Sequence, residues 1–175
     1  MDLPLALATL LHVLVLVYWL GGDVGAFYAS WIVTDPARPV SDRRLALGIV
    51  NAVDLAPRLS LIAALPTGLL LADVTGWLAI PAPALIAAFG VGGAWIALIL
   101  SLHRSHGDDQ PFLKNLDLAI RWVLLIGLVI VASASVIGAL PIPLFVGLKC
   151  ALLAATIAFG LRIRATLAAF GPAIA

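Results

Sequence analysis

The chain contains little charge and almost no sulfur. Charged residues make up only 11% of the 175 residues, whereas soluble domains carry about 25%. The net charge of +1 gives no basis for binding nucleic acid. Because Cys150 is the only cysteine, no intrachain disulfide can form. With 63% hydrophobic residues and a mean hydropathy of +1.17, the sequence predicts an all-α integral membrane protein whose first partner is the lipid bilayer.

Several familiar motifs are also missing. The sequence contains no nucleophilic triad, phosphate-binding loop or zinc-protease motif, which argues against hydrolase chemistry. It shows no internal repeat, low-complexity tract or soluble segment. We therefore expect residues 1–175 to form a single transmembrane helical domain.

Five apolar stretches reach the roughly 20 residues that a helix needs to cross a bilayer. They cover approximately residues 5–33, 45–72, 82–102, 118–140 and 143–161. The first stretch lacks a basic start and is too long for the core of a signal peptide, so we expect it to be retained. The sequence thus predicts a bundle of five transmembrane helices.

The basic residues between these stretches predict an orientation. They fall in the first loop, the third loop and the C-terminal tail: Arg38, Arg43, Arg44, Arg104, Lys114, Arg162 and Arg164. The N-terminus and the second and fourth loops contain no Lys or Arg. The positive-inside rule therefore predicts an outside N-terminus and a cytoplasmic C-terminus, in the cell (inner or plasma) membrane.

Three charged residues lie within the predicted spans, where charge is costly and usually marks a site. At 1.5 Å per residue, Asp23 and Asp54 lie roughly 15 and 16 Å from the cytoplasmic ends of their helices, and so at one level. Arg58 follows Asp54 by four residues on the same face, and Asn51 lies one turn inward. This Asp/Asp/Arg centre is open to two interpretations: a structural ion pair that joins the first two helices, or a polar site that relays protons or ions.

Two other polar residues lie deep within predicted helices. His12 and Lys149 are each about two turns from the outer end of their helix. His12 has two interpretations, an interhelical hydrogen bond or an axial ligand to haem iron. Lys149 either extends towards the interface or binds an anion such as a propionate. At the cytoplasmic side, His103 and His106 are predicted to lie in a solvated loop rather than in a metal site.

Small residues recur on the first helix at Gly21, Gly25 and Ala29. This spacing lets two helix backbones approach closely. It predicts tight packing within the bundle, with a homodimer contact as the alternative.

Three short motifs resemble a known family. Leu11-His12 followed by Trp19-Leu20-Gly21-Gly22 resembles the first helix of the copper-resistance protein D (CopD) family and of the related HemJ-type protoporphyrinogen oxidases. Phe145-Val146-Gly147-Leu148-Lys149, followed by Arg162, is similar to the closing motif of that family. Pro66-Thr67-Gly68 is similar to the end of its second helix.

The resemblance implies copper handling, or binding of haem b with membrane redox or porphyrin chemistry. In the second case His12 is the axial ligand to the haem iron, with Trp19 and Lys149 in the same cofactor site. A sulfur-lined copper path is disfavoured because Met1 and Cys150 are the only sulfur-containing residues.

Two other functional hypotheses follow from the residues alone. The Asp/Asp/Arg centre fits a small transporter of ions, metals or solutes. A purely structural centre fits an accessory subunit of a larger membrane complex.

Overall fold

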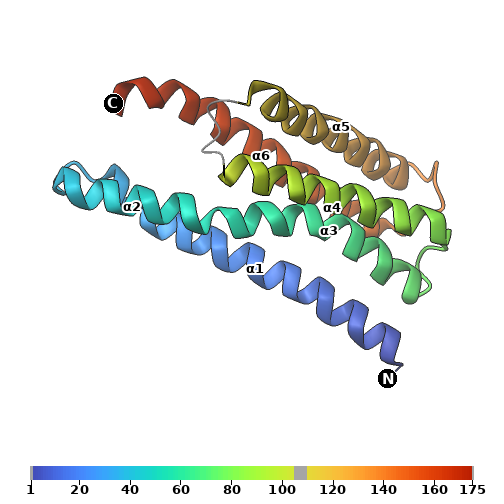
Figure 1. Ribbon diagram of the computed structural model, residues 1–175. Coiled ribbons are helices and arrows are strands. Elements are labelled where there is room, and N and C mark those ends of the chain that lie inside the picture. Colours follow the sequence, from blue (N-terminus) through green and yellow to red (C-terminus); the bar gives the residue numbers. More distant parts are fainter. Residues whose placement is uncertain (1, 105–109, 175) are drawn as a thin grey trace. The chain divides into compact units, whose positions relative to one another are not determined.

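The computed structural model describes residues 2–104 and 110–174, with side chains as far as Ile163, and this part of the chain is all-helical (Figure 1). The helices are α1 (Leu3–Thr34), α2 (Val40–Val53), α3 (Leu55–Val74), α4 (Ala82–Arg104), α5 (Pro111–Val136) and α6 (Leu144–Ile174). Within the described residues, five spans are long and apolar enough to cross a membrane, with Val40–Val74 counted as one. The predicted number of spanning helices is therefore confirmed.

The helix predicted over residues 45–72 is interrupted, and in this respect the prediction was wrong. Asp54 separates α2 from α3, with φ −61° and ψ −15°. Pro57 has no backbone N–H to donate to the carbonyl of Val53, so the helical ladder loses one bond at this point. The chain nevertheless continues in the same sense, because the N–H of Asp54 donates to the Val50 carbonyl at 2.9 Å.

The fifth helix also differs from its predicted bounds. The helix predicted over residues 118–140 begins at Pro111 and ends at Val136. Lys114 and Asp117 lowered the hydropathy of its first two turns and so concealed its start. Gly138, with φ +70°, ends the helix in a left-handed conformation that glycine adopts at little cost. The last helix begins at Leu144, as expected, but remains helical well beyond residue 161.

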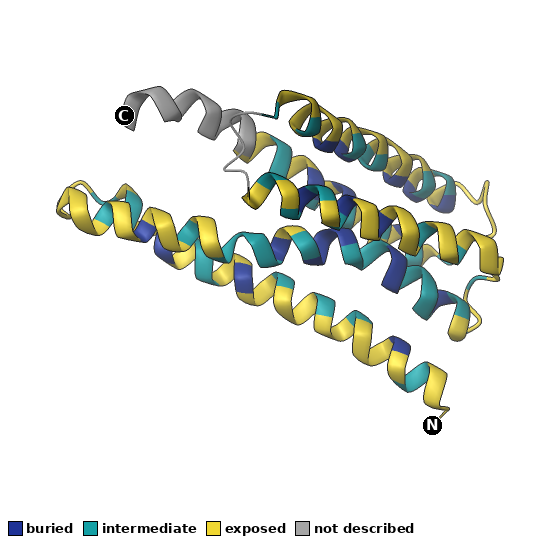
Figure 2. Cartoon of the chain, viewed as in Figure 1, coloured by how far each residue is buried: buried dark blue, intermediate teal, exposed yellow. Residues whose placement is uncertain are grey.

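The described helices form two compact units, Met1–Ser101 and Leu102–Ala175. In the first unit, α1 packs along α2 and α3. The buried residues of α1 are Ala8, Gly22 and Ala29, and half-buried His12 and Trp19 lie between them on the same stripe. The rest of the α1 surface is largely exposed, as Figure 2 shows.

The contact of α1 with Val53 and Pro57 uses a different set of small residues from the one predicted. A Cβ atom at Gly22 would lie 2.6 Å from Pro57 Cγ, and one at Gly25 would lie 3.3 Å from Val53 Cγ1. A Cβ at Gly21 would meet nothing within 4 Å. The helix contact therefore uses Gly22, Gly25 and Ala29, because it follows alternating steps of three and four residues rather than steps of four.

In the second unit, α5 packs against α6. Their closest approach is at Gly147, where a Cβ would lie 2.5 Å from Ser135 Oγ. Ile157 on α6 is 1% exposed, and Leu128, Ala132 and Ala154 are also buried. Small residues therefore set the distance between these two helices.

Candidate functional site

His12 is on α1 in the first unit, and its side chain contacts α3. Its Nδ1 is 2.9 Å from Thr67 Oγ1, and the Thr67 hydroxyl is 2.7 Å from the carbonyl oxygen of Ala63. A hydroxyl has one proton, and the Ala63 carbonyl can only accept, so Thr67 donates to Ala63 and accepts from His12. This places a proton on Nδ1 of the ring.

The absence of a side chain at Gly68 leaves room for the His12 imidazole against α3. A Cβ at Gly68 would lie 3.3 Å from His12 Cε1, which is a tight contact. Thr67 is 3% exposed, so the ring is held by a buried partner. Two of the motifs that carry the family resemblance, separated by 55 residues in the sequence, therefore meet at this point.

Trp19 lies two turns beyond His12 on the same stripe of α1. Its side chain lies close to the carboxylate of Asp23, one turn farther along the helix. Trp19 thus connects the His12 level with the acidic centre along one side of α1.

The Asp/Asp/Arg centre is assembled at the break between α2 and α3. Arg58 forms an ion pair with Asp54 through Nη2 and Oδ2 along one helix. The contacts of Gly22 and Gly25 bring this part of α1 beside Val53 and Pro57. Asp23 is therefore at the level of Asp54, close enough for their charges to interact.

The members of this centre are only partly covered. The Arg58 and Asp54 side chains are 44% and 33% exposed, and Asp23 and Asn51 are also exposed. From His12 to Asp23 is eleven residues, or about 16 Å along the helix axis. The two polar levels of the first unit are therefore separate.

Lys149 lies on α6 in the second unit and is exposed. Its Nζ is 5.7 Å from the centre of the Phe145 ring, one turn nearer the start of the helix. The side chain therefore extends towards the end of α6 that the charge pattern assigns to the outer side.

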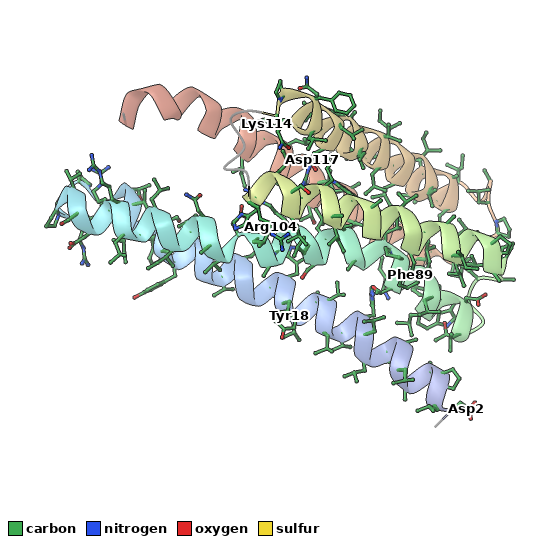
Figure 3. The ribbon with its side chains drawn as sticks, viewed as in Figure 1. Asp2, Tyr18, Phe89, Arg104, Lys114 and Asp117 are labelled. Carbon is green, nitrogen blue, oxygen red and sulfur yellow. The ribbon has the colours of Figure 1, made fainter. Side chains whose placement is uncertain are left out.

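The most deeply buried charged pair among the described residues was not predicted from the sequence. Asp117 and Arg121 on α5 are 1% and 5% exposed, and Arg121 Nε lies 3.1 Å from both carboxylate oxygens (Figure 3). Their spacing of four residues is the signal that could have revealed them. It was missed because Asp117 falls just before the predicted start of the helix.

Few residues could hold a metal through clustered side chains. Among the described residues, no group of three or more His, Cys or Asp side chains could hold a metal ion. His103 lies in the last turn of α4, while His106, the other histidine of that pair, lies outside the described residues. His12 is the one histidine in residues 1–101.

Comparison of the chain with models of protein families, with curated proteins and with solved structures found no match.

Proposed function

We propose that this chain is an integral membrane protein of the cell membrane, with its N-terminus outside and its C-terminus in the cytoplasm. Five apolar spans and the one-sided distribution of Lys and Arg support this proposal. Trp31 and Trp77 are exposed near helix ends, where tryptophan commonly meets the membrane interface.

Within this membrane protein, we propose that His12 is an axial ligand to haem b, in a redox or porphyrin-processing protein similar to the CopD and HemJ group. The observation that carries the proposal is the hydrogen bond from His12 Nδ1 to Thr67. Histidine ligands commonly donate their second ring N–H to a neighbouring acceptor, which fixes the ring and presents the other nitrogen to the metal.

The residues around His12 are compatible with His12 as one axial ligand of a haem. Thr67 holds the ring, and Gly68 gives the space that the ring needs. Trp19 would lie beside the cofactor on the same stripe of α1. When bound, haem would supply one-electron chemistry, whose potential depends on the axial ligand and its hydrogen bonds.

An absorption spectrum of protein purified from haem-replete cells tests the proposal. We expect a Soret band that is lost in His12→Ala and retained in the control His103→Ala. Thr67→Val should weaken haem binding by about 10- to 100-fold, the usual effect of removing such a supporting partner. A colourless wild-type preparation, or a Soret band unchanged by His12→Ala, would contradict the proposal.

A second candidate function uses the Asp/Asp/Arg centre. Arg58 pairs with Asp54, whereas Asp23 lies close to Trp19. Two acids and one cation at mid-span are suited to an ion or proton site in a small transporter, with Asn51 one turn away. Proton or sodium flux into proteoliposomes should fall in the double variant Asp23→Asn with Asp54→Asn and persist in Asp2→Asn. Flux that the double variant leaves unchanged would exclude this function.

A further inference from the structure

The helix over α2 and α3 exposes polar side chains near the middle of its span. Asn51 is exposed, and the ion pair of Asp54 with Arg58 is only partly covered. Polar and ionisable side chains in membrane-spanning helices almost always face protein or a water-filled cavity, because contact with lipid is costly. These three side chains therefore need a polar neighbour beyond the contacts that the first unit gives them.

The exposed polar residues lie on one face that continues across the break between α2 and α3. The backbone N–H groups of Asp54 and Arg58 each donate to the carbonyl four residues earlier, so the helical repeat holds on both sides of the break. Alternating steps of three and four residues place side chains on one side of a helix. Such steps define a set that we call the α2–α3 seam: Arg44, Leu47, Asn51, Asp54 and Arg58.

The seam is on a different side of the helix from the contact with α1. Ala46 is buried, and Val53 is the nearest neighbour of Gly25 on α1. At 3.6 residues per turn, these two residues lie about a third of the way around the helix from the seam. Packing of α1 therefore leaves the seam open, and most of the α2 surface is exposed (Figure 2).

The charges of the seam are complementary to themselves. Asp54 supplies an acid, Arg58 supplies a base one turn away, and the amide of Asn51 can both donate and accept hydrogen bonds. The other charge at this level is Asp23 on α1, which lies close enough to Asp54 for the two carboxylates to interact. A partner with charge of a single sign would match only one of the two seam charges.

A second copy of the chain matches the whole seam. Copies that insert in the same orientation can pair about a two-fold axis along the membrane normal, and residues of the same number then face one another across that axis. The two Asn51 amides would meet at the axis. Each Arg58 would lie within reach of Asp54 in its own chain and of Asp54 of the partner subunit.

We infer that the α2–α3 seam binds a second copy of the chain and forms a parallel homodimer in the membrane. Interhelical hydrogen bonds between the Asn51 amides and ion pairs shared between the copies remove these polar groups from lipid. The inference rests on the proposed membrane insertion, because in water the same side chains would need no cover. It does not depend on the proposed haem ligand His12.

Disulfide cross-linking in native membranes tests the contact. In a Cys150→Ala background, Leu47→Cys places a thiol on the seam, and we expect the oxidant diamide to convert the chain to disulfide-linked dimers. The matched control is Leu45→Cys, which places a thiol on an exposed position of the same helix, two residues away and outside the seam. Leu45→Cys should remain monomeric under the same conditions.

Charge reversal tests which groups hold the two copies together. Added to Leu47→Cys, Arg58→Glu makes the seam acidic and Asp54→Lys makes it basic. Each variant expressed alone should cross-link about tenfold less than the parent, because like charges then face one another. Co-expression of the two variants with different tags should recover the cross-link between them, and this recovery would also show that both variants fold.

The outcomes that overturn the inference are distinct from failure of the proposed membrane insertion. Equal cross-linking of Leu45→Cys and Leu47→Cys would overturn the inference, as would co-expressed variants that cross-link no better than either variant alone. A wild-type monomer that resists extraction by alkaline carbonate would overturn the homodimer and leave membrane insertion intact. Release of the wild-type chain by alkaline carbonate would overturn the proposed insertion, and the inference with it.

Discussion

Asp117 and Arg121 form a pair of opposite charges in one of the least accessible parts of the described chain. Their geometry is compact, since one guanidinium nitrogen lies at equal distances from both carboxylate oxygens. Burying two charges costs several kcal/mol per ion, and the cost is offset only while both partners remain. A substitution of either residue alone should therefore destabilise the protein more than a substitution that replaces both.

Removing one partner should be strongly destabilising. We expect Asp117→Ala to lower the free energy of unfolding in detergent by about 3–5 kcal/mol, because the Arg121 charge loses its buried carboxylate. The double variant Asp117→Leu with Arg121→Met should be closer to the wild type, since it removes both charges. Denaturation monitored by circular dichroism measures both changes.

A surface pair provides the control for this prediction. Asp35 and Arg38 lie 3.6 Å apart in the loop after α1, with side chains 42% and 53% exposed. Asp35→Ala should therefore cost about 1 kcal/mol or less. Equal losses in Asp35→Ala and Asp117→Ala would show that the buried pair has no special role.

At the scale of helices, neighbouring glycines have opposite roles. Gly22 is buried against the Pro57 ring, whereas the space around Gly21 is open. We expect Gly22→Ala to destabilise the protein by about 1–3 kcal/mol, because the added methyl group forces α1 away from α3. Gly21→Ala should be neutral, or stabilising by about 0.5–1 kcal/mol through helix propensity. Thermal unfolding of the two single variants measures the contrast, and similar shifts in both would contradict the predicted contact.

The sequence was sufficient to predict the number of apolar spans but not the number of helices or all of their limits. Long apolar runs predict spanning helices because the bilayer requires them, and hydropathy alone contains that information. It does not register a missing backbone hydrogen bond, so the break that Pro57 causes at Asp54 was not predicted. It also discounts polar residues that are buried in pairs, and for this reason the start of α5 was placed too late.

The candidate site was predictable one helix at a time. His12 and the Pro66-Thr67-Gly68 motif were identified separately, but nothing in the sequence indicated that Thr67 accepts the hydrogen bond from His12. That Asp23 and Asp54 lie at the same depth could be predicted by counting residues, because the helical rise is constant. Whether Arg58 forms its ion pair with Asp23 or with Asp54 could not be predicted, because it depends on side-chain rotamers. These rotamers are determined only when the helices pack.

At the scale of the whole molecule, the proposed orientation depends on where Lys and Arg lie rather than on any single contact. Single cysteines in a Cys150→Ala background can test it in intact cells. We expect Ala79→Cys, between α3 and α4, to react with a membrane-impermeant maleimide from outside. Ala37→Cys, between α1 and α2, should react only after the membrane is permeabilised, because Arg38, Arg43 and Arg44 retain that loop in the cytoplasm.

The two cysteine sites together distinguish the alternatives. The reverse labelling pattern would show that the proposed orientation is inverted. Labelling of both sites from outside would mean that the helix over Val40–Val74 does not cross the bilayer. In that case Asp54 and Arg58 would no longer carry the cost of charge at mid-membrane, and the case for a functional centre that joins them to Asp23 would lose its physical basis.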